Sequence, residues 1–114
     1  MDERSFPSME AFAAFLCEYA TAPLGQPGTC FSSPLALFLS ACFGHVCGVD
    51  EGRYGRAIEE FYRWRSLPQW ARLFTAWCER YAGLAGSMRV MTGGEAFVVL
   101  AWVEAALSQG RSCA

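Results

Sequence analysis

A histidine and two cysteines lie close together in the sequence and are the side chains best suited to metal or thiol chemistry. Cys42, His45 and Cys47 form the pattern Cys-x-x-His-x-Cys, and Cys30 or Cys78 is a possible fourth ligand. Thiolate and imidazole are the ligands of tetrahedral zinc sites, but this spacing is not one of the paired arrangements that identify such sites. A histidine just past a helix end also interacts favourably with the helix dipole without any metal. We therefore expect no bound metal, with Cys42, His45 and Cys47 as the only candidates for one.

The same residues are the most plausible source of a nucleophilic cysteine, because His45 is the one histidine in the chain. A catalytic cysteine needs a base within reach and a third group that orients this base. The chain has no Asn and only two Asp, and it lacks a Gly-x-Ser-x-Gly elbow, a phosphate loop and a dinucleotide fingerprint. Gly93 and Gly94 would suit an anion at a helix start, but Glu95 would repel it. We therefore predict a protein that is not an enzyme and needs no cofactor.

Arginine and aromatic side chains are concentrated in the middle of the chain. All nine positive charges are Arg, and six of them lie between residues 53 and 80, interleaved with Tyr and Trp. A GC-rich genome would also favour Arg over Lys, so the composition alone does not establish a function for these arginines. Arg, Tyr and Trp are nevertheless the residues that dominate protein interface hot spots. The predicted partner-binding residues are Arg63, Trp64, Arg65, Trp70, Arg72 and Trp102.

The overall charge favours a protein partner over a nucleic acid. The isoelectric point is near 5.3, whereas a domain that binds nucleic acid typically has one above about 9. A protein interface also accounts for an excess of apolar helix faces. We therefore predict a small non-enzymatic protein-interaction domain, acting as a homodimer or as an adaptor or inhibitor docked on a larger complex. The alternative is a weak nucleic-acid binder that uses residues 53–72, and the third possibility is a thiol or metal-binding protein.

Helical spacing of apolar residues predicts a mainly α fold, a compact bundle of four to five short helices. The helices are expected over residues 9–22, 34–43, 54–63, 69–82 and 94–107, with a strand over 61–65 as the alternative in the third of these. Residues 24–29 are expected as a loop, and residues 46–49 are expected to pair with residues 89–91 in a small two-stranded β-ribbon. Ser8, Ser33 and the pair Thr92 and Glu95 have the types and positions of helix N-caps.

Two of these helices are apolar on almost every side. Residues 34–43 are expected to be central or covered by a second copy, and residues 96–103 to be buried all round. Residues 1–114 are expected to form one domain, with 108–114 as a short flexible tail. The start of the chain lacks a secretory signal, and no apolar run approaches the ~20 residues of a membrane span. We therefore expect a cytoplasmic protein that does not bind membranes and whose six cysteines are free thiols.

The outline that follows from these elements resembles that of small proteins of phages and mobile genetic elements. The resemblance lies in chain length and in the mostly helical pattern, and no motif in the chain is specific to one family. It implies a phage or mobile-element protein, for which the larger complex would belong to a host.

Overall fold

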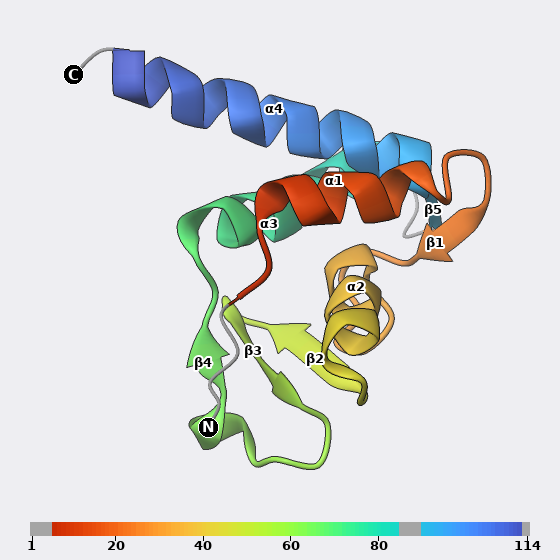
Figure 1. Ribbon diagram of the computed structural model, residues 1–114, viewed down its shortest axis with the longest axis vertical. Coiled ribbons are helices and arrows are strands. Elements are labelled where there is room, and N and C mark those ends of the chain that lie inside the picture. The colour runs from red at the N-terminus through yellow and green to blue at the C-terminus, as the bar shows by residue number, and fades with distance from the viewer. Residues whose placement is uncertain (1–5, 85–89, 113–114) are drawn as a thin grey trace.

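The computed structural model describes residues 6–84 and 90–112. These residues form four α-helices, one 3₁₀ turn and two small antiparallel sheets (Figure 1), so the fold is mainly helical but is a mixed α/β fold and not a pure bundle. The helices are α1 (Met9–Cys17), α2 (Pro34–Phe43), α3 (Gln69–Leu84) and α4 (Gly93–Ser112), and the 3₁₀ turn is η1 (Phe61–Arg63). One sheet pairs β1 (Pro23–Gly25) with β5 (Met91–Thr92), and the other has the order β2 (Cys47–Asp50), β3 (Arg53–Arg56), β4 (Arg65–Ser66).

The predicted helix starts are confirmed. Ser8 and Ser33 each accept a hydrogen bond from the backbone N–H three residues later, at 3.0 and 3.3 Å. Thr92 and Glu95 form a reciprocal capping box, in which the Glu95 N–H donates to the Thr92 hydroxyl (3.1 Å) and the Thr92 N–H donates to the Glu95 carboxylate (2.9 Å). Gly44, with a φ of 79°, ends α2 at the predicted position. Local capping chemistry therefore sets where these helices begin.

The helix predicted over residues 54–63 is wrong, because the chain forms a β-hairpin there. Residues 53–56 are strand β3, which pairs with β2 through the register Gly48 to Gly55 and Asp50 to Arg53. Glu51 and Gly52 both have positive φ (50° and 76°), as the two-residue turns that suit tight hairpins require. The alternative strand over 61–65 is also wrong for most of its length, because residues 61–63 are a 3₁₀ turn and β4 begins at Arg65.

The predicted ribbon between residues 46–49 and 89–91 is wrong as well. β2 takes β3 as its partner, whereas Met91 pairs with Gly25 in the other sheet. Strand β1 therefore occupies residues that were expected to begin a loop. Residue 89 lies outside the described residues.

Two helix ends also differ from expectation. Helix α1 ends at Cys17 and not near residue 22, and turns follow it. Helix α4 continues to Ser112, so residues 108–112 are helical and not a tail, while residues 113–114 lie outside the described residues. The turns after α1 have partners from a distant part of the chain, because the Tyr19 and Ala20 carbonyls accept hydrogen bonds from Gly93 and Gly94.

The carboxyl end of α1 meets the amino end of α4. The Gly93 N–H donates to the Tyr19 carbonyl (2.9 Å) and the Gly94 N–H donates to the Ala20 carbonyl (3.0 Å). The first N–H groups of α4 thus donate hydrogen bonds to backbone carbonyls that follow the end of α1. A Cβ at position 93 would collide with the Leu16 carbonyl oxygen and would lie 2.6 Å from that of Tyr19. The two glycines allow this approach and do not cradle an anion.

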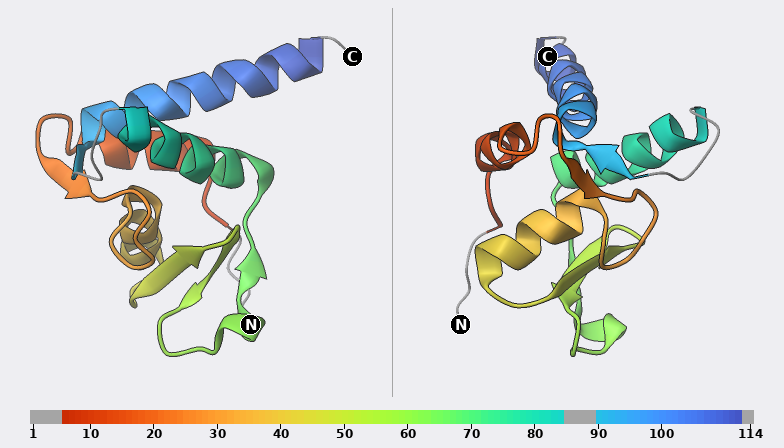
Figure 2. Two further views of the ribbon diagram at one scale, coloured as in Figure 1. Left: turned by 180° about the vertical axis from the view of Figure 1, so that it is seen from behind. Right: turned by 90° about the vertical axis from the view of Figure 1, so that its right-hand side faces the viewer.

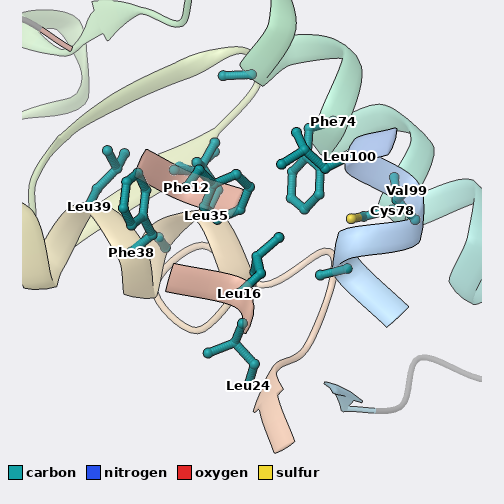
Figure 3. Packing of buried hydrophobic residues seen from close by; sticks show 14 of the residues in the cluster. Phe12, Leu16, Leu24, Leu35, Phe38, Leu39, Phe74, Cys78, Val99 and Leu100 are labelled. Carbon is teal, nitrogen blue, oxygen red and sulfur yellow. The ribbon is translucent and has the colours of Figure 1, made fainter. Parts of the chain in front are cut away.

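The helices and the larger sheet enclose one cluster of buried side chains. Helix α4 lies over both α1 and α3, and α2 and the β2–β3–β4 sheet lie on their other side (Figures 1 and 2). Side chains of α1 and α2 meet those of α3 and α4 in the interior (Figure 3). The large buried members shown there are Phe12, Leu16, Leu24, Leu35, Phe38, Leu39, Phe74, Val99 and Leu100.

The two apolar helices have different surroundings. Most of the first half of α2 is buried, as expected for a central helix. Helix α4 is not buried all round: Phe97, Val98 and Trp102 are 40%, 45% and 49% exposed. Only the side of α4 that carries Ala96, Val99 and Val103 faces the core.

We predict that Gly93→Ala destabilises the protein by about 1–3 kcal/mol, because backbone carbonyls of the α1 end must move to admit the methyl group. Gly44→Ala is the matched control. No atom lies within 4 Å of its added Cβ, so it should cost only about 1 kcal/mol for the left-handed backbone. Urea unfolding followed by circular dichroism measures both values. An equal loss in the two variants would contradict the close approach at Gly93.

Candidate functional site

The six residues predicted to bind a partner do not form one surface. Arg63 and Arg65 line a cavity, Arg72 lies beside a different cavity, and Trp102 is on the outer side of α4. The other two members, Trp64 and Trp70, are part of the packing of the fold. The structure therefore divides the predicted contact surface among three regions, which are described in turn.

Trp64 is buried, with 8% of its surface exposed, and it covers the hairpin. Gly48 and Gly55 are directly opposite each other in β2 and β3. A Cβ on Gly48 would lie 2.6 Å from Cη2 of the indole, and one on Gly55 would lie 2.5 Å from Cγ. The indole thus occupies the space that two missing side chains leave, and its Nε1–H donates to the Glu59 carbonyl (3.3 Å). This contact folds residues 57–63 back over the strands.

Trp70 and Arg72 lie near the start of α3. The Trp70 ring is half-buried, and its centroid is 5.7 Å from those of both Phe6 and Phe12, so it belongs to the edge of the core. The side chain of the exposed Arg72 lies next to the turn at Gly52. It also lines a cavity of about 370 Å³. Asp50, Glu51 and Glu79 also line that cavity, so its charge is mixed.

A larger cavity of about 630 Å³ lies at the end of the molecule opposite α4, among the end of α2, β2, β3 and the segment that leads to β4 (Figure 1). We call it the arginine cleft. Its lining residues are Phe43, His45, Cys47, Tyr54, Gly55, Arg56, Glu59, Arg63 and Arg65. Volumes of about 300–1,000 Å³ are typical of small-molecule sites.

Positive charge predominates in the arginine cleft. Arg56, Arg63 and Arg65 are exposed, and none of them forms an ion pair with a carboxylate of the described residues. Glu59 is the one acidic residue of the lining, and its Oε1 accepts a hydrogen bond from the Arg56 backbone N–H (3.3 Å). Three guanidinium groups and one carboxylate give the cleft a net charge of +2.

Three nearly parallel rings form an aromatic wall of the arginine cleft. The Phe43 ring makes an angle of 14° with His45 and 12° with Tyr54, with centroids 6.0 and 6.4 Å away. All three rings are half-buried. Tyr54 is also held from another direction by Phe6, whose centroid is 4.9 Å away. The wall therefore consists of side chains that are already packed before any ligand arrives.

Two of the three candidate metal and thiol residues, His45 and Cys47, line this cleft. His45 Nδ1 is 3.5 Å from Cys47 Sγ, and Cys42 is exposed on the last turn of α2. Burial raises the pKa of the Cys47 thiol to about 11, although nearby Arg56 acts to lower it. An activated cysteine has a lowered pKa, so Cys47 has the opposite character. Within residues 6–84 and 90–112, no three Cys, His, Asp or Glu side chains converge as metal ligands.

The described cysteines form no disulfide. These are Cys17, Cys30, Cys42, Cys47 and Cys78, and Cys113 lies outside the described residues. Burial raises the pKa of Cys78 far above its ordinary value and also raises that of Cys42. For Cys30, burial and then the negative charge of Asp50 raise the pKa. These shifts all favour the protonated form.

The outer face of α4 is a second candidate surface. We use this name for Phe97, Val98, Ala101, Trp102 and Ala105, all of which are exposed. Each of them is three or four residues away from at least one other member, so they lie on one side of the helix. Trp102 is 49% exposed, and the centroid of its ring is 6.3 Å from that of Tyr81. This face is opposite the one that packs on α1 and α3.

Comparison with known proteins identifies no relative of this chain. No family model, no curated protein and no solved structure matches the chain. Among the described residues, none of the helices combines the length and the apolar composition that crossing a membrane requires. The chemistry of the arginine cleft and of the outer face of α4 is therefore the basis for a proposed function.

Five lining residues of the arginine cleft were not among the predicted site residues: Phe43, Tyr54, Gly55, Arg56 and Glu59. Tyr54, Arg56 and Glu59 lie within the segment 53–72, but a helix over 54–63 does not predict the pairing of β3 with β2. The signal that could have revealed the site is the sequence Asp50-Glu51-Gly52, a turn between two short segments that each contain a glycine. Recognising that hairpin would have placed β3 beside the end of α2.

We predict that Trp64→Ala destabilises the protein by about 3–5 kcal/mol, because it leaves a cavity over the two glycines and breaks the link to Glu59. Tyr62→Ala removes a neighbouring aromatic ring that is 70% exposed and should change stability by less than about 0.5 kcal/mol. Urea titration of both variants gives the two values. A Trp64→Ala variant as stable as Tyr62→Ala would show that the indole does not support the hairpin.

We also predict that the Cys47 thiol of the folded protein reacts with iodoacetamide at a rate that keeps rising up to about pH 11. The thiolate is the reactive form, and burial delays its formation in the folded state. Peptide mass spectrometry after a short labelling pulse, from pH 7 to pH 12, measures the midpoint in folded and in urea-unfolded protein. The unfolded midpoint should be lower. Identical midpoints would contradict the effect of burial.

Proposed function

We propose that this protein is a protein-interaction domain that associates with a second copy of itself through the outer face of α4. The observation that carries the proposal is the half-exposed Trp102, which lies beside the exposed Phe97 and Val98 on one side of the helix. Large aromatic side chains that gather on one exposed face are characteristic of interaction sites in soluble proteins. Tryptophan is also among the residues that contribute most to binding energy at interfaces.

The shape of α4 supports a contact along its length. The helix has 20 residues, which corresponds to a length of about 30 Å. Its inner side is held by α1 and α3, so the outer face is presented on a fixed support (Figure 2). A rigid surface loses little conformational entropy when it binds. Two such helices lying against each other would bury the five apolar residues of both copies.

The charge on the outer face favours a second copy as the occupant. A symmetric dimer uses the same patch on both subunits, so the patch must complement itself. A face that carries several charges of one sign would repel its own copy, but the five residues of this face are uncharged and Glu104 is a single exposed carboxylate next to them. Packing of Trp102 against Trp102 across a two-fold axis needs no complementary charges. An adaptor or inhibitor docked on a different protein would use the same face, and the experiment separates the two cases.

The expected result is a concentration-dependent dimer that Trp102→Glu converts into a monomer. Loss of a central interface tryptophan and burial of a charge should weaken dimerisation by at least about 30-fold, since hot-spot residues contribute about 2 kcal/mol or more. Sedimentation equilibrium from low to high micromolar concentration measures the association, and circular dichroism verifies the fold. Ile58→Glu is the matched control because Ile58 is 83% exposed and lies on the turn after β3.

A second variant separates dissociation from unfolding. Ala101→Glu adds a charge to the middle of the outer face without removing a packed side chain, and it should also produce a folded monomer. A wild-type protein that is folded and monomeric at high micromolar concentration would overturn the proposal of self-association. A dimer that survives both Trp102→Glu and Ala101→Glu would show that the contact lies elsewhere.

A further inference from the structure

We propose that the arginine cleft binds a nucleoside phosphate, with its terminal phosphate on Arg56, Arg63 and Arg65 and its base against the aromatic wall. This site is at the opposite end of the molecule from the outer face of α4 (Figure 1). It does not depend on self-association, so each proposal can fail while the other holds.

The charge of the cleft matches a terminal phosphate. The three arginines come from three consecutive elements, namely β3, η1 and β4, and the hairpin fold brings them to one cavity. Within residues 6–84 and 90–112, none of them forms an ion pair with a carboxylate. A phosphate monoester carries a charge of about −1.5 to −2 at neutral pH, and the net charge of the lining is +2. Arginine binds phosphate through pairs of N–H donors.

The aromatic wall favours a ligand that carries a flat ring. The rings of His45 and Tyr54 are each within 14° of parallel to the Phe43 ring, and all three residues line the same cavity as the arginines. Stacking of a base on aromatic side chains contributes strongly to binding and tolerates different bases, because every base has a flat face. The volume of about 630 Å³ is larger than a bare phosphate needs and suits a molecule of nucleotide size.

A long nucleic-acid strand fits the cleft less well than a terminal phosphate. Each internal phosphodiester carries a single negative charge, and a strand is usually held along an extended basic groove. The three arginines here lie at one cavity, and three acidic residues line the cavity beside Arg72. The chain as a whole has a net charge of −2. The chemistry therefore favours one nucleoside phosphate, either free or at the phosphorylated end of a strand.

Isothermal titration calorimetry of the full chain at low salt tests the site. The probes are AMP, GMP, CMP and UMP, with adenosine and inorganic phosphate as controls that each lack one half of the ligand. At least one mononucleotide should bind with at least about tenfold higher affinity than either control, because only it contacts both arginines and rings. Arg63→Ala and Arg65→Ala should each weaken that binding by about tenfold or more. Arg80→Ala, which removes an exposed arginine of α3 outside the cleft, should leave it unchanged.

The variant Glu59→Gln should change the binding affinity in the opposite direction. It removes the one negative charge of the lining but keeps an acceptor for the Arg56 N–H, so mononucleotide binding should become a few-fold tighter. The source of the ligand is tested with a short oligothymidylate with and without a 5′-phosphate. Stronger binding of the phosphorylated strand than of any mononucleotide would assign the site to strand ends and still support the proposal.

Several results would overturn this assignment. The first is that neither a mononucleotide nor a 5′-phosphorylated strand shows saturable binding. The second is that inorganic phosphate binds as tightly as the mononucleotides, and the third is that the phosphorylated and unphosphorylated strands bind equally. Binding that survives both Arg63→Ala and Arg65→Ala would equally overturn it. If Arg65→Ala fails to fold, as circular dichroism would reveal, Arg63→Ala and Glu59→Gln still decide the matter because both residues are exposed.

Discussion

The contact between the carboxyl end of α1 and the amino end of α4 is the constraint on which the rest of the arrangement depends. The N–H groups of Gly93 and Gly94 bond to carbonyls at the α1 end, and the capping box at Thr92 and Glu95 satisfies further donors of the same helix start. This junction fixes the direction in which α4 crosses α1 and α3. It thereby decides which side of α4 is buried, and consequently which apolar residues remain on the outer face. The proposed interaction surface is a consequence of a backbone contact that only glycine permits.

A second constraint acts at the other end of the molecule. Trp64 fills the space over Gly48 and Gly55, and its indole N–H holds the Glu59 carbonyl. Residues 57–63 are therefore held against the hairpin, which brings Arg63 and Glu59 to the same cavity as Arg56. Trp64 acts as a support for this site and does not itself present a surface. The charged side chains of the arginine cleft are positioned by an apolar contact beneath them.

The two candidate surfaces have different chemistry and are well separated. One is an uncharged, apolar helix face, and the other is a positively charged cavity with an aromatic wall. Self-association through α4 would leave the arginine cleft accessible on both copies, because the cleft lies at the opposite end (Figure 1). A dimer would then present two identical ligand sites. Our two proposals assign different roles to these features, ligand binding to the arginine and aromatic residues of the cleft and self-association to the apolar surface of α4.

The sequence by itself determined the features that depend on neighbouring residues. The helix starts at Ser8, Ser33 and Thr92 and the end of α2 at Gly44 were predictable, because a cap bonds to backbone within a few residues of itself. The sequence predicted Arg63 and Arg65 as contact residues, and only the tertiary structure placed them with Arg56 at one cavity. Tyr54, Ala57, Ile58 and Phe61 have helical spacing, yet the tertiary structure made their segment a strand and a turn, because strand pairing and the Trp64 contact outweigh a weak local preference. Which residues of α4 are exposed was likewise decided only by the tertiary structure, since a helix that is apolar on every side does not indicate which side its neighbours will cover.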